Sequence, residues 1–80
     1  MRYFDAVILA HGIDRKGILH DVAEIISKKL SVNIHKVNFT AEDGIFEGKI
    51  EIRVHDRDEV KVIVDELKKI DDLQEVQHIM

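Results

Sequence analysis

The chain has 80 residues, of which 45% are hydrophobic and 35% charged, so it can form one small core and has the composition of a folded globular protein. The absence of cysteine excludes disulfides and thiolate metal sites, and the net charge of −4 argues against a broad basic face for nucleic acid. No stretch approaches the roughly 20 apolar residues of a membrane span, and we expect one cytoplasmic domain over residues 1–80.

The first predicted element is a strand over Tyr3–His11, because polar and apolar positions alternate there. The face expected to point into the core carries Phe4, Ala6, Ile8 and Ala10. The opposite face is also apolar in its middle, through Val7 and Leu9. A strand with two apolar faces is typical of the centre of a sheet.

An amphipathic helix is predicted after the loop Gly12–Gly17 and extends to about Leu30. Its apolar residues recur at three- and four-residue spacing: Ile18, Leu19, Val22, Ile25, Ile26 and Leu30. A second strand is predicted from Val32 to Thr40. Its apolar positions do not keep one parity, which predicts a bulge or an edge strand.

A hairpin is predicted at residues 42–44, because the sequence Glu-Asp-Gly contains residues that tolerate positive φ. The strand that follows, Phe46–His55, alternates more cleanly than any other segment. We expect one of its faces to lie in the core and the other to face water.

A second helix is predicted to begin at Asp56, which forms a capping-box pattern with Glu59, and to end near Ile70. Its apolar stripe consists of Val60, Ile63, Val64 and Leu67. The tail from Leu73 to Met80 is too short for a helix and is predicted to be a last strand.

The predicted order is therefore strand, helix, strand, strand, helix, strand. Right-handed crossovers in such a chain place both helices on one face of a four-stranded antiparallel sheet. The sequence thus predicts an α+β fold of the ferredoxin-like βαββαβ type, with all elements in one domain.

The loop between the first strand and the first helix is the candidate binding site. Gly12 and Gly17 would let a ligand approach the backbone, and the free N–H groups at a helix start favour a carboxylate or phosphate. Asp14 could accept a hydrogen bond from an ammonium group. The alternative is that Asp14 simply caps the helix.

The run Asp14-Arg15-Lys16-Gly17-Ile18-Leu19, the pair Asn33-Ile34 and the closing Val76 resemble the ACT domain. This resemblance covers the chain from about Asp5 to Ile79. It implies the same fold and a role as an amino-acid-sensing module attached to a metabolic enzyme.

Within that family the chain is most similar to the C-terminal ACT domain of RelA/SpoT-type (p)ppGpp synthetase/hydrolases, which share this run and a following aspartate, here Asp21. The resemblance implies a C-terminal regulatory fragment of a GTP pyrophosphokinase that acts in the stringent response. Amino-acid binding, ribosome contacts or intramolecular contacts would carry the allosteric regulation. It also implies no catalytic residue in this domain, and we expect neither a metal site nor a cofactor.

The resemblance assigns ligand-binding roles by position. The matching residues are Gly12, Asp14, Arg15, Gly17, Ile18 and Asn33. In ACT dimers the asparagine often completes the pocket, so Asn33 of one chain is expected near the Asp14 loop of the other.

The same residues also bear on other functions. The five histidines lack the spacing of a metal motif. Acylphosphatases share this fold class and use an arginine of the first loop, which keeps Arg15 as a candidate for an enzyme. RNA-recognition modules share the strand order but stack bases on aromatic residues that are missing here. A protein- or RNA-interaction module without a small ligand remains the alternative function.

Self-association is expected at the edge formed by the second strand, because unpaired backbone groups there can pair with a second copy. The sequence thus predicts a homodimer. The alternative is a monomer whose edge is protected by Lys36 and a bulge.

Overall fold

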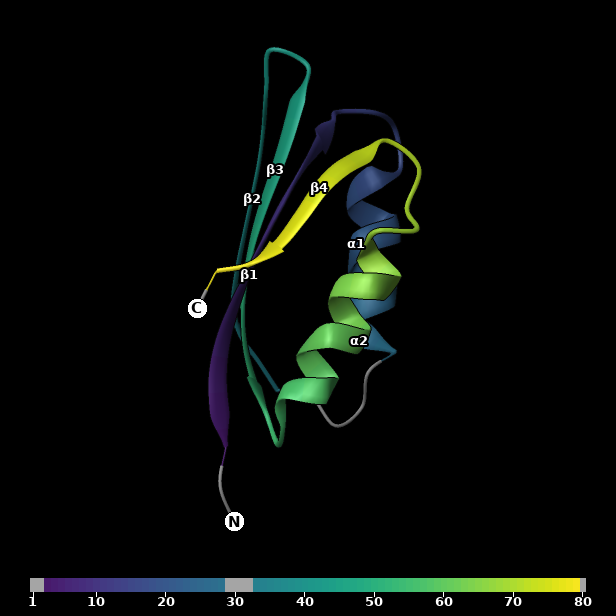
Figure 1. Ribbon diagram of the computed structural model, residues 1–80. Helices are drawn as coiled ribbons and strands as arrows, with labels where there is room; N and C mark the ends of the chain where they lie inside the picture. The colour runs from purple at the N-terminus through teal and green to yellow at the C-terminus, as the bar shows by residue number, and fades with distance from the viewer. Residues whose placement is uncertain (1–2, 29–32, 80) are drawn as a thin grey trace.

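Four strands and two helices follow one another along the chain in the predicted order (Figure 1). The computed structural model describes residues 3–28 and 33–79. Its elements are β1 (Phe4–Ile13), α1 (Ile18–Ser27), β2 (Asn33–Glu42), β3 (Ile45–Val54), α2 (Arg57–Leu67) and β4 (Leu73–His78).

The strands form one antiparallel sheet in the order β2-β3-β1-β4, and both helices cover the same face of it (Figure 1). This arrangement confirms the ferredoxin-like fold. It also confirms that β1, which is apolar on both faces in its middle, is a central strand. Neither helix in the described part of the chain is long and apolar enough to span a membrane.

The core lies between the helices and the inward faces of the strands. No polar or charged side chain is buried among the described residues. The buried residues are Ala6, Ile8, Ala10, Ile18, Val22, Ile26, Phe46, Ile50, Ile52, Val54, Val60, Ile63, Val64, Leu67, Leu73 and Val76. Alternation therefore identified the inward face of β1 and β3, except that Phe4 at the start of β1 is 41% exposed.

The second strand is both bulged and at the edge of the sheet. Its register against β3 shifts between Ile34 and Lys36, which places the bulge at His35. The strand runs to Glu42, two residues beyond the predicted end. The predicted positions of Leu30 and Val32 lie outside the described residues.

The turns follow the predicted chemistry. Asp43 and Gly44 both have positive φ, 52° and 78°, as a tight hairpin between right-twisted strands requires. The Asp56–Glu59 capping box is present at the start of α2. The helix ends at Leu67 rather than near Ile70, because the N–H groups of Lys69 and Ile70 bond three residues back and tighten the chain into turns.

Gly12 is needed where β1 meets the start of β4. It is buried and pairs with Leu73, at a shift in the β1–β4 register. A Cβ atom on Gly12 would collide with the backbone carbonyl of Asp72 and lie 2.8 Å from the Cα of Leu73. The absence of a side chain thus allows the α2–β4 turn to pack against β1.

We expect Gly12→Ala to lower the free energy of unfolding by about 2 kcal/mol, because the backbone it meets must shift. The matched control is Gly44→Ala, which has open space but a φ of 78° and should cost about 1 kcal/mol. Urea unfolding followed by circular dichroism measures both. Equal stabilities for the two variants would contradict the close approach at Gly12.

Candidate ligand-binding site

A hollow of about 230 Å³ opens between the start of α1 and the end of the β2–β3 hairpin. It is lined by Asp14, Arg15, Gly17, Ile18, Leu19, Phe39, Thr40, Ala41 and Phe46. The hairpin rises beyond the β1–α1 loop, so the helix-side face of its tip is left without a helix over it (Figure 1). The hollow lies on this helix-side face of the hairpin, next to the start of α1.

The floor and far wall of the hollow are apolar. The rings of Phe39 and Phe46 stack with centroids 5.6 Å apart. Phe39 pairs with Gly48 of β3. A Cβ atom on Gly48 would lie 3.0 Å from the Phe39 ring, so the glycine allows the ring to pack against β3. Leu19, which the periodicity assigned to the core face of the first helix, is instead 48% exposed beside the hollow.

The near wall of the hollow is polar and comes from the β1–α1 loop. Gly17 is the N-cap of α1 with φ 87°, and no side chain caps the helix. The interpretation of Asp14 as a helix cap is therefore wrong. Its carboxylate is exposed and has no hydrogen bond or ion pair with any described residue, while its backbone N–H donates to the carbonyl of Gly44 at 2.9 Å.

The first turn of α1 offers free donors to this wall. Within residues 3–28 and 33–79, nothing accepts a hydrogen bond from the backbone N–H of Leu19 or His20. Such groups carry the positive end of the helix dipole. The hollow thus combines an apolar floor, a carboxylate and the N–H of Leu19, which has no acceptor among the described residues.

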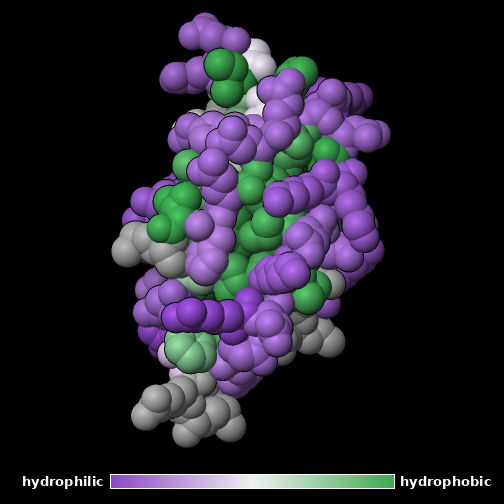
Figure 2. Space-filling model, in the orientation of Figure 1, coloured by the Kyte–Doolittle hydropathy of each residue, from purple (hydrophilic) through white to green (hydrophobic). Residues whose placement is uncertain are grey.

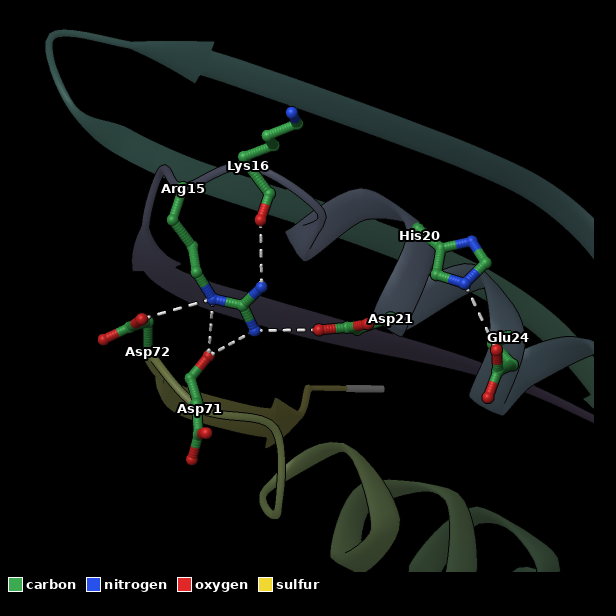
Figure 3. Close-up of polar contacts among 7 residues, drawn as sticks. All are labelled: Arg15, Lys16, His20, Asp21, Glu24, Asp71 and Asp72. Carbon is green, nitrogen blue, oxygen red and sulfur yellow. Dashed lines mark hydrogen bonds and ion pairs between the residues drawn. The ribbon is translucent and has the colours of Figure 1, made fainter.

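The Arg15 guanidinium is engaged within the protein (Figure 3). It contacts Asp21 Oδ2 at 2.8 Å and Asp72 Oδ2 at 3.2 Å, and it donates to the carbonyls of Asp71 at 2.9 Å and Lys16 at 3.2 Å. The hydrogen bond with Asp21 is the main reason that the pKa of Arg15 is raised. Arg15 therefore ties the loop to α1 and to the α2–β4 turn.

The structure brings four of the six predicted site residues together at the hollow: Asp14, Arg15, Gly17 and Ile18. Gly12 does not line the hollow and packs instead against the α2–β4 turn. Asn33 lies at the other end of the sheet, paired with Arg53, whereas the loop adjoins the end where Ile13 pairs with Ile45. Asn33 and the loop are thus apart within one protomer.

Sequence reasoning missed the wall that the hairpin supplies, namely Phe39, Thr40, Ala41 and Phe46. The sequence signal for this wall was one phenylalanine on each side of the turn at residues 42–44, Phe39 and Phe46, with Gly48 in the strand that follows the turn.

Three of the five histidines each contact a single carboxylate or an aromatic ring. His11 Nε2 is 2.9 Å from Glu47 Oε2, and His20 Nε2 is 3.2 Å from Glu24 Oε2. His55 lies against the ring of Tyr3 at the opposite end of the sheet from His11. No group of three metal-ligating side chains occurs among the residues that the structure covers.

The fold and the loop motif define a regulatory domain of the ACT type. The family model for the ACT domain matches residues 1–77, and the chain belongs to this family. The predicted resemblance is therefore confirmed. ACT domains are regulatory rather than catalytic parts of proteins.

The structure is similar to the ACT domain from the GTP pyrophosphokinase of Chlorobium tepidum. The crystal structure of that domain superposes with a TM-score of 0.92 at 29% identity, covering 98% of this chain and 100% of that one. Its solution NMR structure gives a TM-score of 0.87 at 30% identity, over 99% and 89% of the two chains. No curated protein sequence matches the chain.

The same fold also occurs as part of a larger chain. A homoserine dehydrogenase from Thiobacillus denitrificans superposes with a TM-score of 0.73 at 15% identity, and the match covers 98% of this chain but 17% of that one. At this identity the likeness concerns the fold alone.

We expect Arg15→Gln to speed amide exchange of Ile13 and Leu73 several-fold, because Arg15 holds the turn that accepts the Ile13 N–H at 2.8 Å. The matched control is Arg57→Gln, which removes an exposed arginine at the start of α2. Native-state hydrogen exchange by NMR measures both variants. Unchanged protection of Ile13 in Arg15→Gln would show that the loop and turn are held by other contacts.

Proposed function

We propose that this ACT domain is the regulatory domain of a cytoplasmic RelA/SpoT-type GTP pyrophosphokinase or (p)ppGpp hydrolase and that it senses an amino acid in the stringent response. Similarity over the full length of the Chlorobium tepidum domain supports the parent enzyme class. The observation that carries amino-acid sensing is the hollow, in which a free carboxylate and free helix N–H groups border an apolar floor.

The chemistry of the hollow favours an amino acid with an apolar side chain. The ligand carboxylate would accept hydrogen bonds from the N–H groups of Leu19 and His20 at the positive end of α1. The ligand ammonium would donate a hydrogen bond to Asp14. The side chain of the ligand would then lie against Phe39 and Phe46. The volume of about 230 Å³ lies below the roughly 300–1,000 Å³ typical of sites for drug-sized ligands, in agreement with a small ligand.

The domain acts as a homodimer in this proposal, through the edge strand β2. A two-fold axis through the middle of β2, between Val37 and Asn38, would pair two copies of the strand antiparallel and set Asn33 of one copy opposite Glu42 of the other. Glu42 is the next residue after Ala41 of the hollow. Such a dimer would bring Asn33 of one copy to the end of the sheet at which the hollow of the other copy lies.

Titration of the domain with the twenty amino acids, followed by amide chemical shifts, tests the sensing function. We expect shifts at residues 14–19 and 39–46 for amino acids with apolar side chains. Asp14→Asn should weaken this binding about tenfold, because it removes the charge-assisted hydrogen bond to the ammonium group. The control Asp65→Asn removes an exposed carboxylate on α2 and should leave the affinity unchanged.

A different outcome would favour the alternative function. The face of the sheet opposite the helices is uncovered, and Val7 and Leu9 are half-buried on it. If no amino acid shifts the loop while RNA or a domain of the parent enzyme shifts this face, a protein- or RNA-interaction module replaces the sensor.

Asn33→Ala tests the dimer. We expect it to weaken amino-acid binding several-fold, since Asn33 would lie beside the end of the second copy that carries the hollow. The control Asn38→Ala changes an exposed amide in the middle of the same strand and should have no effect. Light scattering should give twice the monomer mass of 9.2 kDa. A monomeric mass, with equal affinities for the two variants, would contradict the shared site.

A further inference from the structure

The outer face of the sheet, which lies opposite the helices, carries an exposed apolar pair where the β2–β3 hairpin ends. Residues of a strand alternate between the two faces, and Phe46 is buried in the core, so its neighbour Ile45 points outward. Ile45 pairs with Ile13 of β1, and the two residues are 59% and 46% exposed. This end of the outer face is therefore apolar and has no described element over it.

A hollow of about 250 Å³ adjoins this apolar pair on the outer side of the hairpin. It is lined by Thr40, Glu42, Asp43, Ile45 and Glu47, and thus by three carboxylates and no lysine or arginine. Glu42 and Asp43 make no ion pair with a described residue, and Glu47 contacts His11 at 2.9 Å. Figure 2, in the orientation of Figure 1, shows hydrophilic residues at the tip of the hairpin with hydrophobic residues among them.

Glu42 and Glu47 lie on neighbouring strands and on the same face of the sheet. Glu42 pairs with Ile45, and Thr40 pairs with Glu47, so the two glutamates are diagonal neighbours. The Cβ atoms of diagonal neighbours lie roughly 7 Å apart. One planar guanidinium, with its fork of five N–H donors, can therefore contact both carboxylates, whereas an ammonium group is a compact point charge.

The negative charge continues across β1 to the far side of the sheet. His11 pairs with Glu47 of β3 on one side and with Glu75 of β4 on the other. The next outward residue of β3 after Glu47 is Lys49, so the acidic surface is confined to the hairpin end of the face. Carboxylates thus lie on both sides of the apolar residues of β1 at this end.

We propose that this end of the outer face is a docking surface for a segment of a partner protein that carries arginine beside an aliphatic residue. The guanidinium would enter the hollow and donate hydrogen bonds to Glu42 and Glu47. The aliphatic side chain would cover Ile13 and Ile45 and remove them from water.

The charges favour this partner over other occupants. A nucleic acid or an anionic membrane would bring phosphates to these carboxylates, where like charges repel. A second copy has the same net charge of −4, which opposes its approach. Apart from Thr40, the surface shares no lining residue with the hollow at α1, so the proposal does not depend on amino-acid sensing.

The probe is a five-residue peptide of alternating arginine and leucine, blocked at both ends, titrated into the domain. We expect amide shifts at residues 13, 42–47 and 75, no shifts at residues 19–20, and weaker binding as salt rises. A peptide with lysine in place of arginine should bind several-fold more weakly, and one with glutamate should not bind at millimolar concentration.

The variant Glu42→Gln/Glu47→Gln should bind the arginine peptide about tenfold more weakly. The matched control Asp58→Asn/Asp65→Asn removes two exposed carboxylates of α2 and should bind as the unchanged domain does. Ile45→Thr keeps a β-branched residue in the strand and should bind several-fold more weakly, because the apolar contact is lost.

Absence of shifts at millimolar peptide, equal binding of the lysine or glutamate peptide, or an equal loss in the control variant would overturn the proposal. Full affinity of Ile45→Thr would overturn it as well, since charge attraction alone would then explain the binding. Shifts of residues 42–47 that depend on domain concentration without peptide would overturn it in favour of a second copy.

Discussion

The position of β1 between β3 and β4 is the constraint on which the rest of the domain depends. Its inward residues lie under both helices, and its backbone is paired with β3 along its whole length. β4 can pair with the other edge of β1 only because Gly12, which has no side chain, lets the α2–β4 turn approach the β1 backbone. This junction fixes the direction in which the β1–α1 loop leaves the sheet, and with it the near wall of the hollow.

Much of the fold could be predicted because the informative contacts are local or periodic. Alternation in Phe46–His55 and the Asp56–Glu59 pair specify an inward face and a helix start within a few residues. The helix end at Leu67 was missed, since tightened turns after a helix leave little trace in a sequence.

The candidate site was harder to predict, because its parts come from distant segments. The run from Asp14 to Ile18 locates the loop, but Arg15 reaches Asp71 across 56 positions and Phe39 closes the hollow from another strand. Leu19 is exposed because the described elements leave its side of α1 uncovered at the hollow. Helical periodicity does not predict which elements pack against a helix.

The four contacts of Arg15 also have a mechanical consequence. One planar guanidinium spans the loop after β1, the first turn of α1 and the turn before β4, so these three segments behave as a single rigid corner. A displacement of the loop by about an ångström or more would break these bonds unless the start of β4 moved with the loop. Arg15 therefore couples the loop that borders the hollow to the start of β4.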